Sequence, residues 1–245
     1  MSAIAQLFLV NLKIIYRNKT ALFWNAAMPL GLYIALSILP LPKMADIPYR
    51  EYLLPGMIAY VIMTNGIYGL AYWMAEMRSK NIIKRFLVTP IKVRELALSL
   101  VASRLVVMFC QVTLLTLTGT IFFNTPFAGN YFSIFLLTVL GGAIFLFAGL
   151  LIANYSSSYE TATPLTAAVG LPMAFLGNVF FPSEALPNGL KFLGEHLPIS
   201  YLAEGLRHSY LQSFDFAKIS GDLLGLFIWF MLLLAITIKL FKLKE

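Results

Sequence analysis

The chain has 245 residues, of which 60% are hydrophobic and only 12% are charged, and its mean hydropathy is +0.81. This composition excludes a water-soluble protein. A formal charge of +7 can indicate a nucleic-acid partner, but here most lysines and arginines lie between apolar segments, where they report membrane topology. We therefore expect an all-α polytopic membrane protein, with the lipid bilayer and no nucleic acid among its partners.

Uncharged stretches define the expected spans, because crossing about 30 Å of hydrocarbon takes about 20 helical residues. A turn-forming cluster at 124–130 divides one long uncharged run into two spans. The chain is expected to form a single transmembrane domain over 1–245. The six predicted transmembrane helices are 20–42, 52–75, 97–123, 131–153, 163–181 and 221–240.

Basic residues set the expected orientation, because cytoplasmic segments carry the excess of lysine and arginine. Six spans place both termini on one side, together with the basic loop 76–95. The opposite side holds only Lys43, Arg50, Lys191, Arg207 and Lys218. We expect a multi-pass protein of a bacterial-type plasma (inner) membrane with both termini cytoplasmic.

Three segments do not fit simple spans. Residues 1–19 carry apolar residues at helical spacing and basic residues toward the end, which predicts a helix in the membrane interface. The loop 77–90 predicts a short helix whose exposed apolar face needs the membrane surface or another protein as its partner. The stretch 182–205 is apolar but interrupted by prolines, which predicts re-entrant or interface-lying helices.

Catalytic and metal-binding motifs are weak. The nearest approach to a P-loop, Gly189 to Gly194, lacks the phosphate-binding lysine, so the chain is not expected to hydrolyse ATP or to be catalytic by itself. His196 and His208 lie near Glu195 and Glu204, but their spacing is not that of a metal site. We predict no catalytic residue and no metal site, and keep a membrane-embedded enzyme using the histidines as a rival hypothesis.

Polar uncharged side chains occur inside the predicted spans. Asn65, Tyr68 and Tyr72 share one face of the second span, and such a stripe can line a path for an amphipathic substrate or simply join helices. Charged residues are nearly absent from the spans, which argues against an ion-coupled carrier or a stand-alone channel. Arg104 is the nearest exception, and its side chain is expected to snorkel to the cytoplasmic surface. The candidate pathway residues are Asn25, Tyr33, Asn65, Tyr68, Tyr72 and Asn178.

The order of these segments resembles the permease subunit of type-2 ATP-binding-cassette exporters, a family of bacterial drug, polysaccharide and teichoic-acid exporters. Three places carry the resemblance. The first is Tyr16-Arg17-Asn18-Lys19 followed by Pro29. The second, Glu76 followed by Ile83-Lys84-Arg85-Phe86-Leu87-Val88-Thr89-Pro90-Ile91, is similar to the family's coupling helix, although Asn81 stands where the family commonly has glycine. The third comprises Gly177, Phe180-Phe181-Pro182, Leu186-Pro187 and Leu197-Pro198-Ile199-Ser200-Tyr201, with Glu204 and Arg207.

The resemblance implies partners and site residues. Two copies of a separate P-loop ATPase subunit would bind the ATP and magnesium. A second permease chain, identical or similar to this one, would complete the complex. This chain itself would hold no cofactor. The implied ATPase-coupling residues are Glu76, Lys84, Arg85, Phe86, Leu87, Thr89 and Pro90. The implied external gate consists of Phe180, Phe181, Pro182, Pro187, Pro198, Glu204 and Arg207.

The expected function is ATP-driven export of an amphipathic drug-like or lipid-like substrate from the cytoplasm or inner leaflet, as in multidrug transport and antibiotic resistance. Export of a lipid-linked polysaccharide or teichoic acid by the same mechanism is the alternative. A stand-alone channel and a membrane-embedded enzyme are the rivals from other classes.

Overall fold

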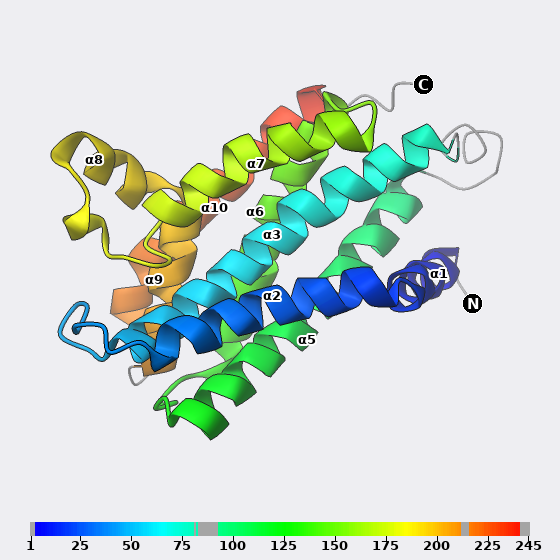
Figure 1. Cartoon of the computed structure of the whole chain (residues 1–245). Coiled ribbons are helices and arrows are strands. Elements are labelled where there is room, and N and C mark those ends of the chain that lie inside the picture. The colour runs from blue at the N-terminus through cyan, green and yellow to red at the C-terminus, as the bar shows by residue number, and fades with distance from the viewer. Residues whose placement is uncertain (1–2, 81, 83–92, 212–215, 241–245) are drawn as a thin grey trace.

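The structure is a computed structural model that describes residues 3–80, 82, 93–211 and 216–240. In this part of the chain the predicted all-helical fold is confirmed, and the long helices form an elongated bundle (Figure 1). The helices are α1 (Ala3–Arg17), α2 (Lys19–Ile38), α3 (Tyr49–Ser79), α5 (Val93–Phe123), α6 (Tyr131–Asn154), α7 (Tyr159–Leu176), the 3₁₀-helix η1 (Ser183–Ala185), α8 (Asn188–His196), α9 (Pro198–Leu211) and α10 (Phe216–Leu240).

Five of the described helices, α2, α3, α5, α6 and α10, are long and apolar enough to cross a membrane, which supports a polytopic membrane protein. Helix α7, where a further span was expected at 163–181, is not among them. It has 18 residues and contains Glu160, Pro164 and Pro172, which lower its apolar character. It nevertheless packs against α3 and runs along the bundle toward α8 (Figure 1).

Helix α3 forms the centre of the bundle. In its most apolar stretch 78% of residues are buried, against 11% in α2 and 17% in α10, and it packs against α2, α5, α6, α7 and α9. Glycines allow the closest of these approaches: a Cβ added to Gly149 of α6 would lie 2.5 Å from the Gly66 carbonyl oxygen of α3. Small residues at such positions let the backbones of two helices approach closely.

Short polar residues separate the helices. The Asn18 side chain accepts a hydrogen bond from the Ala21 amide at 3.1 Å and so begins α2 directly after α1 ends. Ser158 and Thr161 form a reciprocal capping box at the start of α7. Asn124, with φ 50°, follows the end of α5 in the left-handed region that asparagine tolerates.

Helix α1 lies crosswise to the bundle: Figure 1 shows it almost along its axis, whereas α2 and α3 run across the picture. It packs against α5, where the buried Asn11 side chain donates to the Ser99 hydroxyl at 3.3 Å. Lys13 and Arg17 remain exposed. A crosswise amphipathic helix of this kind suits the membrane interface.

The segment between α7 and α10 consists of short pieces separated by prolines. Pro182 precedes η1, Pro187 precedes α8 and Pro198 begins α9, so no piece is long enough to cross a membrane. The Trp229 indole of α10 donates to the His196 carbonyl oxygen at 2.9 Å and ties the end of α8 to the bundle. In Figure 1, α8 lies at one end of the bundle, called here the α8 end. The start of α1 and the end of α10 lie at the other end, called here the terminal end.

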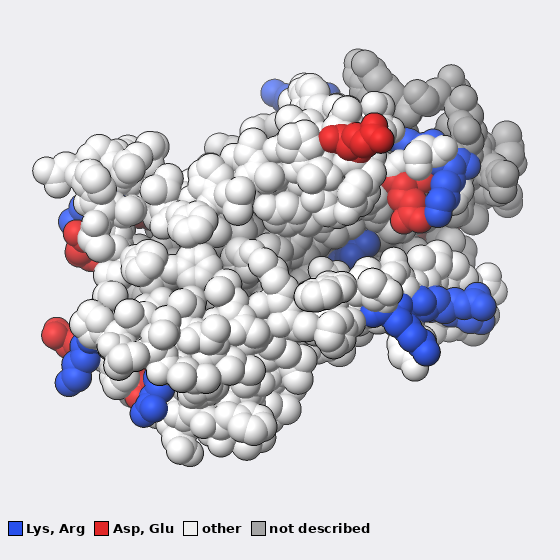
Figure 2. Space-filling model, in the orientation of Figure 1, with Lys and Arg blue, Asp and Glu red and all other residues white. Residues whose placement is uncertain are grey.

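Charges gather at the two ends of the molecule. In the face shown in Figure 2, the blue and red residues occupy the α8 end and the terminal end, with uncharged surface over most of the length between them. Such a band is what a hydrocarbon layer requires.

Candidate functional site

The polar residues in the middle of the bundle join three helices. Asn65 of α3 donates to the Gln111 side-chain oxygen of α5 and to the Val61 carbonyl, and the Gln111 amide donates to the Asn25 carbonyl of α2 at 2.9 Å. Pro29, four residues after Asn25, has no N–H and leaves that carbonyl without its helical partner. The Gln111 side chain thus replaces the hydrogen bond that Pro29 cannot make.

The predicted pathway tyrosines also contact neighbouring helices. The Tyr72 hydroxyl lies 3.2 Å from the Thr166 hydroxyl of α7, and the Tyr68 ring lies edge-on to Tyr72. Tyr33 is fully buried, with its hydroxyl 3.5 Å from that of Thr125. Of these contacts, the one between Tyr72 and Thr166 joins two helices, α3 and α7. The part of these tyrosines in substrate passage stays a prediction.

Two of the predicted pathway residues, Asn25 and Tyr72, line a cavity of about 380 Å³ near the terminal end of the bundle, called here the polar cavity. Its walls come from α1, α2, α3, α5 and α7. The lining residues are Ile14, Ile15, Asn18, Ala21, Leu22, Asn25, Gly69, Tyr72, Trp73, Glu76, Ser79, Arg104, Val107 and Tyr159. Asn65, Tyr68, Tyr33 and Asn178 do not line it.

Arg104 of α5 is the basic residue of this cavity, and sequence reasoning did not identify it as a site residue. Its Nε is buried and has no hydrogen-bond partner, while the side chain as a whole is partly exposed and lines the cavity. The expected snorkelling to the cytoplasmic surface stays a prediction. The Arg104 guanidinium lies against α3, where a Cβ added to Gly69 would come within 2.9 Å of Nη1. The available signal was that Arg104 is the one basic residue inside the predicted span 97–123.

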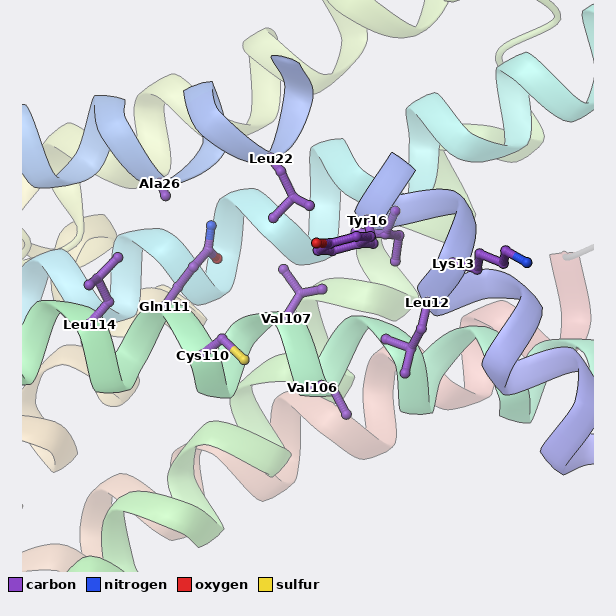
Figure 3. A pocket seen from close by; sticks show the side chains of 11 residues that line it. Leu12, Lys13, Tyr16, Leu22, Ala26, Val106, Val107, Cys110, Gln111 and Leu114 are labelled. Carbon is purple, nitrogen blue, oxygen red and sulfur yellow. The ribbon is translucent and has the colours of Figure 1, made fainter. Parts of the chain in front are cut away.

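An apolar groove adjoins the polar cavity and has a volume of about 610 Å³. It lies between α1, α2 and α5, with Leu22 and Val107 facing one another across it (Figure 3). The groove is lined by Leu12, Lys13, Ile15, Tyr16, Leu22, Ala26, Val106, Val107, Cys110, Gln111 and Leu114. Ile15, Leu22 and Val107 also line the polar cavity, so the two hollows share one wall.

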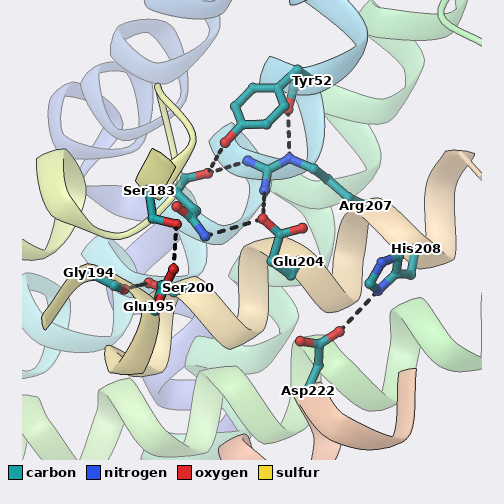
Figure 4. A network of polar contacts seen from close by, with 10 residues as sticks. Tyr52, Ser183, Gly194, Glu195, Ser200, Glu204, Arg207, His208 and Asp222 are labelled. Atoms are coloured by element: carbon teal, nitrogen blue, oxygen red, sulfur yellow. Dashed lines mark hydrogen bonds and ion pairs between the residues drawn. The ribbon is translucent and has the colours of Figure 1, made fainter. Parts of the chain in front are cut away.

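A second polar group joins α3 to α9 toward the α8 end (Figure 4). We call Tyr52, Asn178, Glu204 and Arg207 the α3–α9 network. The Arg207 guanidinium is paired with the Glu204 carboxylate at 2.7 Å, donates to the carbonyls of Tyr52 and Asn178, and lies 3.7 Å from the Tyr52 ring centroid. Asn178 also donates to Glu204 at 3.2 Å. The structure thus places Asn178 with two predicted gate residues, apart from the polar stripe of α3.

The other predicted gate residues lie close to this network. Phe180 is buried, and its ring centroid lies 6.0 Å from that of Tyr60 on α3. Phe181 is exposed. Pro182, Pro187 and Pro198 occupy the breaks between the short helices described above. Their action as a gate stays a prediction.

The two histidines have different partners. The His208 ring of α9 lies 3.1 Å from the Asp222 carboxylate of α10, and this hydrogen bond is the main cause that raises the pKa of His208. His196 contacts the Phe192 carbonyl of its own helix. Within the described residues, no group of three or more His, Cys, Asp or Glu side chains could hold a metal ion.

Of the predicted ATPase-coupling residues, only Glu76 is described. It lies near the end of α3, and its carboxylate pairs with Lys80 at 2.5 Å. Lys84, Arg85, Phe86, Leu87, Thr89 and Pro90 lie outside the described residues.

Comparison with known proteins found one matching family, described as ABC-2 type transporter, over residues 2–211. The chain is 25% identical over 163 residues to the inner membrane transport permease YadH of Escherichia coli (strain K12), which is 66% of this chain and 63% of that protein. It is 22% identical over 207 residues, 84% of each chain, to YvfS of Bacillus subtilis (strain 168), provisionally named a transport permease. It is also 22% identical over 164 residues to ABC transporter G family member 20 of Dictyostelium discoideum, which is 67% of this chain and 22% of that protein. The chain thus spans less than two thirds of the length of the Escherichia coli relative.

Proposed function

Because the chain belongs to the ABC-2 type transporter family, we propose that it is the membrane-spanning permease subunit of an ATP-driven exporter. The observation that carries this proposal is the course of α3. This unbroken helix has 31 residues, and at 1.5 Å per residue it extends about 46 Å. It holds Tyr52 of the α3–α9 network near one end and Glu76 of the polar cavity near the other.

A helix of this kind can couple events at the two faces of a membrane. The chain continues from α3 into the predicted coupling helix 77–90, which in our proposal docks on a separate P-loop ATPase. ATP binding and hydrolysis on that partner would favour two different positions of the terminal end of α3. Because α3 packs against most of the bundle, its displacement would reach the α3–α9 network.

The proposed complex contains two permease chains, identical or similar, and two ATPase subunits, with ATP and magnesium on the ATPases. The chain spans a bacterial-type inner membrane six times, with α7 as the fifth crossing in chain order, and both termini are cytoplasmic. The course of α7 along α3 and the position of the start of α1 and the end of α10 at one end of the bundle support this arrangement (Figure 1).

The proposed substrate is an amphipathic drug-like or lipid-like molecule. A polar cavity and an apolar groove that share a wall suit a molecule with one polar and one apolar part. A lipid-linked polysaccharide or teichoic acid has the same two-part character and is the second candidate.

The test separates coupling from folding. The double variant Arg85→Glu with Phe86→Ala is expected to keep the chain in the membrane and abolish substrate-stimulated ATPase activity and export by the reconstituted complex. The matched control is Lys191→Glu with Phe192→Ala, the same kind of basic and aromatic pair, which lies on α8 at the other end of the bundle. Export at the wild-type level by the first variant, at equal expression, would contradict the role of the coupling helix.

The ATPase partner itself is tested by copurification. The chain extracted in mild detergent is expected to carry a P-loop ATPase in equal number, two of each, as measured by the intact mass of the complex. Repeated recovery without an ATPase, under conditions that keep other complexes whole, would contradict the exporter and leave the channel or enzyme hypotheses.

A further inference from the structure

Among the residues whose burial is described, three arginines have buried or partly buried side chains, and one of these has no partner. Arg207 pairs with Glu204 and with two backbone carbonyls, and Arg78 donates to the carbonyls of Ala153 and Ser156 at the end of α6. The structure assigns no hydrogen bond or ion pair to the guanidinium of Arg104 within the described part of the chain, and its Nε is shielded from solvent.

An unpaired charge inside a membrane protein is costly. Burial of a charged group without compensation raises the free energy of the folded state by several kcal/mol, and a basic residue within a transmembrane helix is therefore expected to have a function. Nη1 lies close to the α3 backbone at Gly69, where an added Cβ would come within 2.9 Å of it. The guanidinium therefore packs against α3 at the wall of the polar cavity.

The surroundings of Arg104 suit an anion. Asn18, Asn25, Tyr72 and Tyr159 line the same cavity with neutral polar groups. Glu76 is the acidic residue of the lining; its carboxylate is half exposed and pairs with Lys80 at 2.5 Å, which offsets part of its charge. Arg104 is the basic residue of the lining and the one that a ligand anion would contact.

The neighbouring groove defines the rest of the ligand. Its lining residues are mostly apolar, and it shares Ile15, Leu22 and Val107 with the polar cavity (Figure 3). A molecule with an anionic head and a hydrocarbon part would therefore find a matching surface for each part within the same region of α1, α2 and α5. Guanidinium groups bind phosphate oxygens with paired, charge-assisted hydrogen bonds.

We propose that Arg104 binds the phosphate of an anionic amphiphile, with the head group in the polar cavity and the apolar part toward the groove between α1, α2 and α5. The proposal rests on the proposed function only for the side of the membrane, because the polar cavity lies toward the terminal end and thus toward the cytoplasmic leaflet. It names a binding site on the permease itself, whether its ligand is transported or retained.

The experiment uses the purified full chain, delipidated in detergent, and measures binding of phosphatidylglycerol by native mass spectrometry. Arg104→Gln is expected to weaken binding about tenfold, and Arg104→Lys to weaken it less, because lysine keeps the charge but not the paired geometry. Arg17→Gln, which removes an exposed arginine at the end of α1, is the matched control and is expected to change binding little.

A second readout separates ligand binding from a structural role. Without lipid, Arg104→Gln is expected to unfold at the same or a higher temperature than the wild type, because it removes an uncompensated charge. Phosphatidylglycerol is expected to raise the unfolding temperature of the wild type and not that of the variant. A lower unfolding temperature of the lipid-free variant would overturn the proposal, since Arg104 would then have an internal structural role.

Competition identifies the source of the phosphate. If millimolar inorganic phosphate displaces the lipid, the site exists and the anion of the head group is sufficient for binding. If it does not, the site exists and binding needs the whole amphiphile. The proposal would be overturned if phosphatidylglycerol bound equally to wild type and Arg104→Gln. It would also be overturned if Arg17→Gln lost as much binding as Arg104→Gln. Because no ATPase takes part, failure here is distinct from failure of the exporter assignment.

Discussion

Arg207 and Glu204 form an ion pair whose two members differ in exposure: the Arg207 side chain is 6% exposed and that of Glu204 is 35% exposed. Substitution Glu204→Gln would leave the arginine charge buried with carbonyl partners only. We expect a loss of about 2–3 kcal/mol, below the range for fully buried pairs because Glu204 reaches solvent. Thermal unfolding of the purified chain measures the effect.

The control for this substitution is Glu195→Gln on α8. Its partner Lys191 lies 3.8 Å away, and both side chains are more than a third exposed. Exposed pairs of this kind contribute less than about 1 kcal/mol. Equal stability losses in the two variants would contradict a special contribution of the α3–α9 network.

His208 provides a pH-dependent contact between α9 and α10. Its hydrogen bond with Asp222 raises its pKa above the ordinary value of about 6.5, while Glu204 acts in the same direction and Lys218 in the opposite one. Since the folded protein holds the proton more tightly than the unfolded chain, the contact contributes fully below pH 6.5, and its contribution is lost as the pH rises through the raised pKa.

Wild-type stability is therefore expected to fall, relative to that of His208→Gln, as the pH rises from below about 6.5 through the raised pKa of His208. The measurement is the unfolding temperature of both chains across this range. A constant difference between them at every pH would contradict the titration of this pair.

The contact between helices α3 and α6 depends on glycine. A Cβ at Gly149 would lie 2.5 Å from the Gly66 carbonyl oxygen, so Gly149→Ala is expected to force the helices apart and lower stability by about 1–3 kcal/mol. Gly31 of α2 has no atom within 4 Å of the same position. Gly31→Ala is expected to leave stability equal or raise it, because alanine favours the helix. Opposite signs in unfolding temperature are the predicted result.

The long helices were predictable because hydropathy decides where a chain can enter hydrocarbon. The residues at which these helices begin and end were less predictable. Charges were used as boundaries for the predicted span 52–75, yet α3 covers Tyr49–Ser79 and includes Glu51 and Arg78. The Arg78 side chain donates to the carbonyls of Ala153 and Ser156, and these partners are present only because α6 ends beside α3.

The candidate site was predictable only in its residue types. Asn25 and Tyr72 were expected to be inside the bundle and do line the polar cavity. The sequence could not show that Asn65 faces Gln111, 46 residues away, or that Asn178 joins Glu204 and not the stripe of α3. Such pairs depend on which helices are neighbours, and helix order in the bundle does not follow from the hydrophobic pattern.

The number of membrane crossings decides which side of the membrane α8 faces. With α7 as a crossing, five spans separate α1 from α8 and place them on opposite sides; without it, four spans place them on the same side. The sequence has one cysteine, Cys110, so single cysteines can be introduced after Cys110→Ala. Arg17→Cys and Lys191→Cys then report on α1 and α8.

A membrane-impermeant maleimide is expected to label Lys191→Cys in intact cells and Arg17→Cys only after permeabilisation. Labelling of both in intact cells, or of neither, would contradict α7 as a crossing. Labelling of Arg17→Cys alone would invert the proposed orientation. The expected pattern would establish both the crossing by α7 and the cytoplasmic side of the termini.

The contact between Asn65 and Gln111 has a consequence for synthesis of the chain. Ribosomes deliver α3 before α5, so Asn65 enters the membrane before Gln111 has been made. During that interval the Val61 carbonyl, within the same helix turn, is the partner available to its amide. The free-energy cost of placing the Asn65 amide in hydrocarbon is therefore low before α5 is made. When α5 arrives, the Gln111 side chain joins Asn65 of α3 to the Asn25 carbonyl of α2, which Pro29 leaves without its helical partner.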